Sequence, residues 1–305
     1  MRVRSITYEA EDVLSFALAD PAGAPLPPWA PGAHVDVLLP NGLERQYSLC
    51  GDPANQDSYR IAVLRENPGR GGSAYLHEQV RPGSMLEIRA PRNNFPLAEA
   101  DRYVLIAGGI GITPLLPMIR ELDRRRTAWR LHYGGRSRAR MAFAAELSSC
   151  GERVSWYPED ECGLIPLKEI LGQVTPGTLV YCCGPEPLLD AVERSCRPDI
   201  LRTERFHPKE IEAAGPDRPV TVVLHRSGRT IEVPAKLSIL DALERAGEDV
   251  PSSCREGTCA TCETPVLEGE IDHRDSILTP DERESGTTMM ICVSRACTDR
   301  LVLDA

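Results

Sequence analysis

Four cysteines near the C-terminal end constrain the folding of this chain more than any other feature. Cys254, Cys259, Cys262 and Cys292 have the spacing C-x4-C-x2-C-x29-C. Plant-type [2Fe–2S] sites have this pattern, in which a tight loop supplies three thiolates and a later segment returns with the fourth. Gly257 lies inside the loop, where the backbone must bend and approach the inorganic sulfides closely. The spacing therefore predicts a two-iron cluster held by these four residues.

Two other interpretations of these cysteines stay open. A structural zinc site usually offers two close pairs of ligands, and here only one C-x2-C pair is present. Unliganded cysteines also pack as small apolar residues, which is the role we expect for Cys297. The chain has 11 cysteines, an odd number, and its N-terminus has no apolar core of the kind a signal peptide needs. A disulfide framework is therefore not expected.

Composition excludes several classes of partner. The 305 residues are enough for two or three domains, and the formal net charge of −10 argues against nucleic acid, because phosphate binding needs a basic surface. The longest charge-free apolar stretch, residues 103–119, is interrupted by glycines and prolines and is shorter than the ~20 residues of a membrane helix. We expect a cytoplasmic protein that spans no membrane and that an acidic surface steers toward a basic protein partner.

The pattern of apolar residues divides the chain into three domains and a linker. Residues 1–99 are rich in short β-branched runs separated by glycine and proline, which indicates a small antiparallel β-barrel with one helix over 73–80. The expected strands of this domain are 34–39, 59–66 and 85–89. Residues 208–218 are polar and read as a linker.

Residues 100–207 alternate strands with helices, which predicts a parallel sheet that binds ligands at the carboxyl ends of its strands. The expected strands are 103–107, 129–133, 154–157 and 179–183, and the expected helices are 115–124, 141–147 and 188–195. Residues 219–305 begin with a hairpin, 220–224 and 230–233, and a helix follows the N-cap Ser238. A capping box at Thr279 and a last strand at 301–303 complete an α+β domain, so the fold class is β, then α/β, then α+β.

Two motifs in the first domain suit a flavin. Arg45-x-Tyr47-Ser48 follows a strand, and it offers a guanidinium for a phosphate, an aromatic face for the ring system and a hydroxyl for flavin N5. Alone, this tetrapeptide is often only a strand with a turn. A glycine-rich segment then opens the expected helix, where free N–H groups form an anion site. The residues expected at the flavin phosphate are Gly71, Gly72 and Ser73.

Two motifs in the second domain suit a nicotinamide nucleotide. A turn containing Gly109 and Gly111 follows a buried strand and opens a helix, which permits close approach of a diphosphate. Cys183 ends another expected strand and is placed to touch a nicotinamide ring, whereas Cys182 is expected to be core packing. A glycine-rich turn by itself is weak evidence, but its place between strand and helix strengthens it.

The chain resembles the phthalate dioxygenase reductase family, which includes the vanillate demethylase reductases. The resemblance covers nearly the whole chain, and it is carried by RQYSLC, GRGGSAYLH, AGGIGITPLLPMI, VYCCGPEPLLDAV, VPSSCREGTCATCE and ICVSRA. It implies FMN rather than FAD, and a third domain of the plant-type ferredoxin class with a β-grasp fold. It also implies that the nicotinamide meets Thr113, Cys183, Gly184 and Pro185, and that Phe206 lies beside the flavin. Ser48 and Cys183 would then be the residues closest to the hydride.

The implied function is a reductase that takes a hydride from NADH and passes single electrons through FMN and the cluster to a terminal Rieske-type oxygenase or O-demethylase. The same electron chain could serve a heme monooxygenase or a diiron hydroxylase instead. A ferredoxin-type carrier without nicotinamide chemistry is a further alternative, although the flavin and nucleotide motifs argue against it. NADPH stays possible, because Arg136 and Arg138 follow the strand where an adenine ribose is expected.

Overall fold

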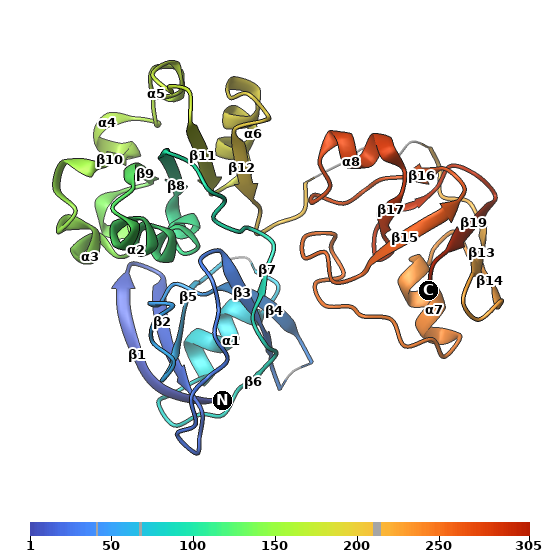
Figure 1. Ribbon diagram of the computed structural model, residues 1–305. Coiled ribbons are helices and arrows are strands. Elements are labelled where there is room, and N and C mark those ends of the chain that lie inside the picture. Colours follow the sequence, from blue (N-terminus) through green and yellow to red (C-terminus); the bar gives the residue numbers. More distant parts are fainter. Residues whose placement is uncertain (41, 67–68, 210–214) are drawn as a thin grey trace. The chain divides into compact units, whose positions relative to one another are not determined.

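The structure, a computed structural model, describes residues 1–40, 42–66, 69–209 and 215–305. The chain consists of two compact units, residues 1–205 and 206–305 (Figure 1). The expected linker at 208–218 is in part outside the described residues, so its boundaries and those of the expected domains stay predictions. None of the described helices combines the length and the apolarity that crossing a bilayer requires.

An antiparallel barrel forms the first half of unit 1–205, as expected. One of its sheets has the order β1-β2-β5, and the other has the order β4-β3-β6 with β7 also paired to β3. An isolated bridge between Leu49 and Ile61 links the two sheets, whose inner faces bury Phe16, Val35 and Leu76 from α1. The bounds are β1 Arg2–Ala10, β2 Val13–Ala19, β3 Ala33–Leu38, β4 Glu44–Ser48, β5 Tyr59–Leu64, α1 Gly72–Gln79, β6 Glu87–Ile88 and β7 Arg92–Asn93.

The first two strands were not expected from the sequence. Most residues of β1 are exposed, and only Val3 and Ala10 are buried, so the strand has little apolar alternation to reveal it. The strand expected at 85–89 is reduced to the two residues of β6, because Met85 pairs only through an isolated bridge to Arg2.

A five-stranded parallel sheet forms the second half of the unit, as expected, in the order β10-β9-β8-β11-β12. The chain reverses its direction of winding between β8 and β11, and ligands bind at such a switch point outside the carboxyl ends of the strands. The short strand β12 and the helices α4 and α5 were not expected. The bounds are β8 Arg102–Gly108, α2 Leu115–Arg125, β9 Ala128–Gly135, α3 Ala144–Ser148, β10 Val154–Pro158, α4 Glu159–Cys162, α5 Leu167–Gly172, β11 Thr178–Cys183, α6 Glu186–Ser195 and β12 Leu201–Glu204, with 3₁₀ turns at Gly109–Ile112, Arg138–Arg140 and Gly151–Arg153.

Unit 206–305 is a mixed sheet packed on a helix, which agrees with the expected β-grasp fold. The sheet has the order β14-β13-β19-β15-β17, with β13 and β19 parallel, and α7 buries Leu240 and Leu243 against it. Ser238 caps α7 and Thr279 forms a capping box with Glu282, both as expected. The bounds are β13 Val220–Leu224, β14 Thr230–Val233, α7 Ile239–Arg245, β15 Glu263–Glu268, β16 Ile271–Asp272, α8 Pro280–Ser285, β17 Thr288–Met290, β18 Arg295–Ala296 and β19 Arg300–Leu303.

The turn after β8 packs directly onto the end of β11. A Cβ atom added at Gly111 would lie 2.2 Å from the carbonyl oxygen of Cys183, and no side chain fits in that space. Glycine at position 111 therefore lets the two nucleotide motifs meet at the switch point of the sheet.

We expect Gly111→Ala to lower the free energy of unfolding of unit 1–205 by about 1–3 kcal/mol, because the added methyl forces the two backbones apart. All three tryptophans, Trp29, Trp129 and Trp156, lie in this unit, so urea unfolding followed by tryptophan fluorescence reports on it. Gly172→Ala is the control, since Gly172 ends α5 with no atom within 4 Å of an added Cβ. Equal stabilities of the two variants would contradict the expectation.

Candidate functional site

The tetrapeptide expected at the flavin lies on β4, at the edge of the barrel. Tyr47 and Ser48 pair with Val35 and His34 of β3, so their side chains alternate across the strand. Tyr47 packs against the barrel core, and this burial raises the pKa of its phenol. Ser48 is buried at the last position of the strand.

The structure brings Arg45 to the start of α1. Its Nη2 donates to the carbonyl oxygen of Arg70 at 3.0 Å, and its side chain packs so closely on Gly72 that an added Cβ would lie 2.7 Å from Cγ. Ser73 is buried in the first turn of α1, and its Oγ accepts the N–H of Glu66 at 3.2 Å. A guanidinium beside the N-terminus of an eight-residue helix is chemically suited to a phosphate monoester, and Gly71, the N-cap, belongs to the same turn.

The two nucleotide motifs meet at the carboxyl ends of β8 and β11. Gly109 accepts a hydrogen bond at its carbonyl oxygen from the hydroxyl of Tyr133, which holds the turn against β9. Thr113 is buried and its hydroxyl donates to the carbonyl oxygen of Ile110 at 2.9 Å. Gly184 and Pro185 continue from β11 into α6, with Pro185 as the N-cap. The expected nicotinamide residues thus lie near one another, at the carboxyl ends of these two neighbouring strands.

Cys183 occupies the expected end of β11, but its thiol is fully buried. Burial raises the pKa of this thiol well above its ordinary value, and the nearby Glu204 and Cys182 raise it further. The group at this position is therefore a neutral thiol, which suits contact with an uncharged ring and is a poor nucleophile.

Glu204 is a residue beside the end of β11 that sequence analysis missed. It ends β12 directly beside Cys183 in the parallel register, and Ser48 Oγ donates to its Oε2 at 3.4 Å. The residue is half-buried, and desolvation by this burial raises the pKa of Glu204 to about 8. Flavin, nicotinamide and carboxyl residues therefore converge, from the barrel and from both sides of the switch point.

The neighbouring Arg205 holds the end of β12 in place. Its side chain is only 6% exposed and pairs with Glu186 and Glu193 of α6. Phe206, which the resemblance places beside the flavin, is the first residue of unit 206–305, and its place at the flavin stays a prediction.

The four cysteines of the predicted cluster lie together in unit 206–305. Interactions with the Cys259 and Cys292 side chains lower the pKa of Cys254, and interaction with Cys292 also lowers the pKa of Cys262. The four thiols are therefore neighbours. Within the described ranges, no group of three or more His, Cys, Asp or Glu side chains is arranged to hold a single metal ion, a finding that bears on zinc and on iron alike.

The loop that carries three of these cysteines is wound tightly around them. Arg255, Gly257 and Ala260 all have left-handed backbone angles, with φ of 56°, 69° and 55°. The Cys254 sulfur accepts the N–H groups of Glu256 at 3.3 Å and of Thr258 at 3.4 Å. Backbone N–H groups aimed at thiolate sulfur are suited to the negative charge of an iron–sulfur cluster.

The buried segment after β16 supports the same loop. A Cβ added at Gly257 would lie 3.0 Å from Cα of Asp275, and the Ser276 N–H donates to the Gly257 carbonyl oxygen at 2.9 Å. Glycine at 257, which the sequence indicated, is thus required both by its left-handed φ and by this close contact. Four thiols, inward N–H groups and a loop without room for side chains together fit a [2Fe–2S] cluster.

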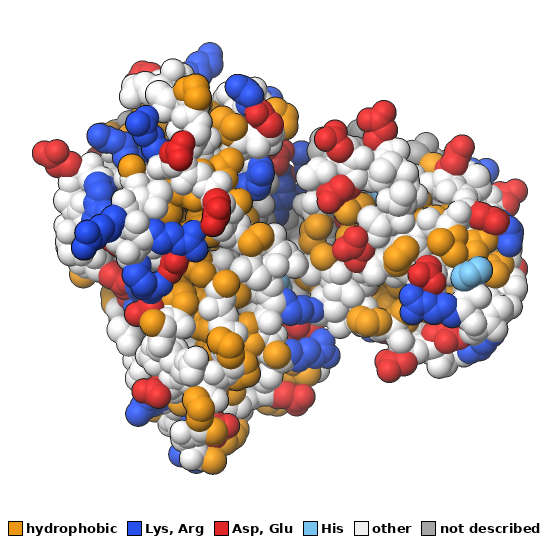
Figure 2. Space-filling view, in the orientation of Figure 1, with side chains coloured by type: hydrophobic (Ala, Val, Ile, Leu, Met, Phe, Trp, Pro, Cys, Tyr) orange, Lys and Arg blue, Asp and Glu red, His pale blue; other side chains and the backbone are white. Residues whose placement is uncertain are grey.

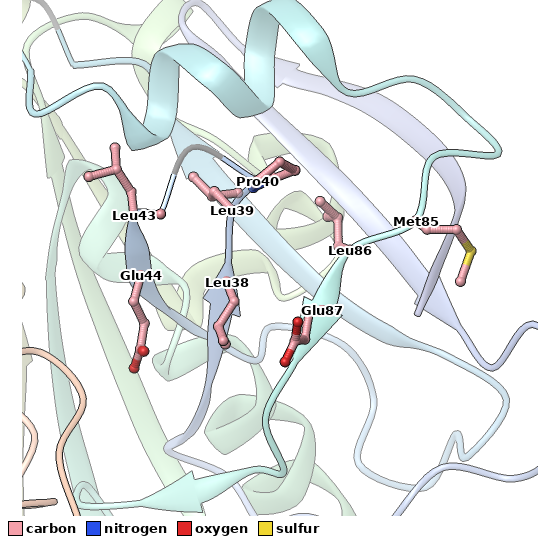
Figure 3. A pocket seen from close by; sticks show the side chains of 9 residues that line it. Leu38, Leu39, Pro40, Leu43, Glu44, Met85, Leu86 and Glu87 are labelled. Atoms are coloured by element: carbon pink, nitrogen blue, oxygen red, sulfur yellow. The ribbon is translucent and has the colours of Figure 1, made fainter.

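A groove of about 570 Å³ lies on the outer edge of the barrel and carries none of the predicted site residues (Figure 3). It runs between the turn after β3 and the start of β6, with leucines on both sides and two carboxylates at one end. Its lining residues are Leu38, Leu39, Pro40, Gly42, Leu43, Glu44, Met85, Leu86 and Glu87. The candidate site formed by the predicted flavin and nicotinamide residues is therefore separate from this groove.

The comparisons with known proteins agree with this geometry. A family model described as a 2Fe-2S iron-sulfur cluster binding domain matches residues 222–297. The chain is 46% identical to phenoxybenzoate dioxygenase subunit beta of Ectopseudomonas oleovorans, over all of this chain and 96% of that protein. It is 41% identical to phthalate dioxygenase reductase of Burkholderia cepacia, over all of this chain and 96% of that protein.

Solved structures of known proteins also match the whole chain. One is a phthalate dioxygenase reductase, described as a modular structure for electron transfer from pyridine nucleotides to [2Fe–2S], with a TM-score of 0.72, 41% identity and 97% of that chain covered. Another is an intact type IV self-sufficient cytochrome P450 monooxygenase, with a TM-score of 0.91 and 43% identity. This chain spans 40% of that longer protein.

We expect the contribution of Glu204 to the free energy of unfolding of unit 1–205 to fall as the pH rises from about 4.5 to about 8. In this window the folded protein keeps a proton on Glu204 that the unfolded chain has already lost, because burial raises the folded pKa. Glu204→Gln has no such proton, so its unfolding free energy, measured by urea titration with tryptophan fluorescence, loses this part of the slope.

The control is Glu169→Gln, which makes the same chemical change at an exposed position of α5. A slope in Glu204→Gln identical to that of the unmodified protein would show that the carboxyl is ionised and solvated in the folded state.

Proposed function

Because the chain belongs to the phthalate dioxygenase reductase family, we propose that it oxidises a nicotinamide nucleotide and delivers the electrons singly, through FMN and a [2Fe–2S] cluster, to an oxygenase. The observation that carries the proposal is the combination, in one chain, of a glycine turn packed on the end of β11 at the switch point of a parallel sheet and a four-cysteine loop in a 2Fe-2S domain. FMN when bound accepts a hydride and releases single electrons, which joins the two-electron chemistry of nicotinamide to the one-electron chemistry of the cluster.

The residues of unit 1–205 bind and orient rather than perform acid–base chemistry. Arg45 and the start of α1 are proposed to hold the FMN phosphate, and Tyr47 to pack on the flavin. Ser48 would donate its hydroxyl near flavin N5, and Cys183 would present a neutral thiol to the nicotinamide. Packing Gly111 against the end of β11 excludes side chains from the place where the nucleotide crosses the sheet.

We propose NADH as the preferred nucleotide, on the basis of ion pairs at the ends of β9 and β10. Arg138 is paired with Glu161, whose two carboxylate oxygens both lie 2.9 Å from its Nε. Arg140 is paired with Asp12 at 2.9 Å and with Glu11 at 3.4 Å. Arg138, one of the two arginines that the sequence offers for a 2′-phosphate, and the nearby Arg140 thus have carboxylate partners, and Glu161 would repel that phosphate.

The acceptor proposed is a Rieske-type oxygenase or O-demethylase that acts on an aromatic compound. Relatives named for phthalate and phenoxybenzoate dioxygenases support it. A heme monooxygenase is the second candidate, favoured by the cytochrome P450 monooxygenase whose structure matches the whole chain.

The charge of unit 206–305 suits an encounter with a basic protein. It holds 19 acidic and 11 basic residues, so it carries −8 of the formal net charge of −10. On the face in Figure 2 the acidic side chains are spread over the surface of this unit rather than gathered in one patch. Such a field speeds association without fixing a single contact.

We expect anaerobic mixing with NADH to bleach the flavin absorbance and then that of the cluster. In Cys262→Ser, iron and sulfide are lost, flavin bleaching persists, and reduction of a one-electron acceptor such as cytochrome c falls at least about 100-fold, since the single-electron exit is gone. Cys297→Ser is the matched control, because Cys297 is half-buried and outside the ligand set. Purified protein that holds zinc instead of iron, or NADH that bleaches nothing, would refute the proposed function.

We expect Glu161→Gln to raise the ratio of kcat/KM for NADPH to that for NADH by about tenfold, which corresponds to about 1.4 kcal/mol, the value of one charge-assisted hydrogen bond. The change frees Arg138 for a 2′-phosphate and removes a repelling carboxylate. Steady-state kinetics with both nucleotides measure the ratio, and Glu152→Gln, at an exposed position, is the control. An unmodified protein that already prefers NADPH would contradict the assignment.

A further inference from the structure

Resting on the proposed function, we propose that Arg120 is a positioning residue for hydride transfer. It holds the segment that follows Ser48 against the helix that follows the nicotinamide turn, and so sets the distance between the flavin and the nicotinamide. Arg120 belongs to none of the motifs found in the sequence, and it contacts none of the residues expected at the flavin or at the nicotinamide.

The contacts of Arg120 join the two halves of unit 1–205. The residue lies in α2, seven positions after Thr113. Its Nη1 donates to the carbonyl oxygen of Cys50 at 2.9 Å and also to that of Gly51. Cys50 follows Ser48 by two positions, so one side chain connects the segments that carry the two proposed reacting rings. The Arg120 side chain is 25% exposed, so the connection is largely shielded from water.

The segment held by Arg120 is fixed on its other side by the barrel. The Cys50 N–H donates to the carbonyl oxygen of Arg60 at 2.8 Å, and the Cys50 thiol donates to the same oxygen at 3.4 Å. Leu49 forms the bridge to Ile61 of β5 that links the two sheets of the barrel. Residues 49–51 therefore lie between β5 and α2. Removing the Arg120 side chain releases the contact with α2 and leaves the barrel contact intact.

A shared carboxylate fixes the guanidinium of Arg120 itself. Its Nη2 donates to Glu146 of α3, and Arg60 donates to the other oxygen of Glu146 at 3.1 Å. Arg60 also pairs with Glu9 of β1 at 2.7 Å, and its guanidinium lies 4.6 Å from the centroid of the Phe143 ring. The network thus reaches from β1 and β5 of the barrel to α2 and α3, and its partly buried ion pairs are stronger than isolated surface pairs.

Hydride transfer is sensitive to this kind of support. The reacting atoms must come within about 3–3.5 Å, and a misplacement of about 1 Å costs on the order of 100-fold in rate. The planar guanidinium can donate to two successive carbonyl oxygens and a carboxylate at once, which a single ammonium cannot reproduce. If Arg120 only stabilised the fold, its removal would lower stability and flavin content without changing the rate per bound flavin.

The test uses the holoprotein and three variants: Arg120→Gln, Arg120→Lys and Arg124→Gln. Flavin reduction is followed in single-turnover mixing over a series of NADH concentrations and normalised to bound FMN. We expect the limiting rate to fall about 10- to 100-fold in Arg120→Gln and by less in Arg120→Lys. The NADH concentration for half-maximal rate should stay within about twofold, because Arg120 contacts no nucleotide residue.

Arg124→Gln is the matched control. Arg124 lies one turn later in the same helix, pairs with Asp52 at 3.2 Å and with Glu121, and its side chain is 49% exposed. The control therefore makes the same change of charge at a pair that water already screens, and it should reduce flavin at the rate of the unmodified protein.

The outcomes separate the two proposals. If Arg120→Gln does not bind FMN, the limiting rate of Arg120→Lys tests the positioning role instead, because lysine keeps the positive charge and one donor nitrogen. A wild-type limiting rate in Arg120→Lys or in flavin-replete Arg120→Gln overturns the positioning role, and so does an equal loss of rate in Arg124→Gln. Unmodified protein that no nicotinamide nucleotide reduces would instead refute the proposed function.

Discussion

The close packing of the turn after β8 on the end of β11 is the constraint on which the site in unit 1–205 depends. A Cβ atom added at Gly111 would lie only 2.2 Å from the carbonyl oxygen of Cys183, so no side chain fits at this position. The turn that follows β8 is thereby held against the end of β11, at the switch point of the sheet. Because β12 pairs with β11, this also places Glu204 beside Cys183, where Ser48 of the barrel reaches it. Barrel and sheet thus meet where the Ser48 hydroxyl donates to Glu204.

The division of the chain into two units matches a division of chemistry. Unit 1–205 is shaped for a nucleotide and a flavin, which exchange two electrons as a hydride. Unit 206–305 gathers four thiols in a loop whose N–H groups face the Cys254 sulfur, an arrangement for a centre that changes by one electron. Most of the negative charge of the chain lies on the second unit, which the proposed function assigns to the encounter with the acceptor.

The sequence predicted those structural features that depend on residues close together in the chain. The caps at Ser238 and Thr279 and the parallel sheet depend on neighbouring residues or on a short repeating pattern, and the structure confirms them. The four-cysteine ligand set also depends on fixed spacing, and it stays a prediction. Strand β12 was missed because its four residues, LRTE, include only one large apolar side chain.

Contacts between residues far apart in the chain produce no local pattern in the sequence. Glu204 meets Ser48 across 156 positions, and Arg120 meets Cys50 across 70, so neither role follows from local pattern. A carboxylate at the end of a short strand and an arginine within an amphipathic helix have ordinary surface explanations. The expected place of Phe206 at the flavin depends on how the second unit meets the first, and it stays a prediction.

The burial of most cysteines has a consequence for chemical durability. Reduced flavins exposed to oxygen generate peroxide, which attacks thiolates rather than thiols. Burial raises the pKa of Cys50 to about 12 and raises the pKa of Cys182 and Cys183 as well, so these three stay protonated. Cys162 is the exposed cysteine of the chain. Peroxide formed by the protein's own flavin would therefore oxidise the surface cysteine at the end of α4 and spare the three buried thiols of unit 1–205.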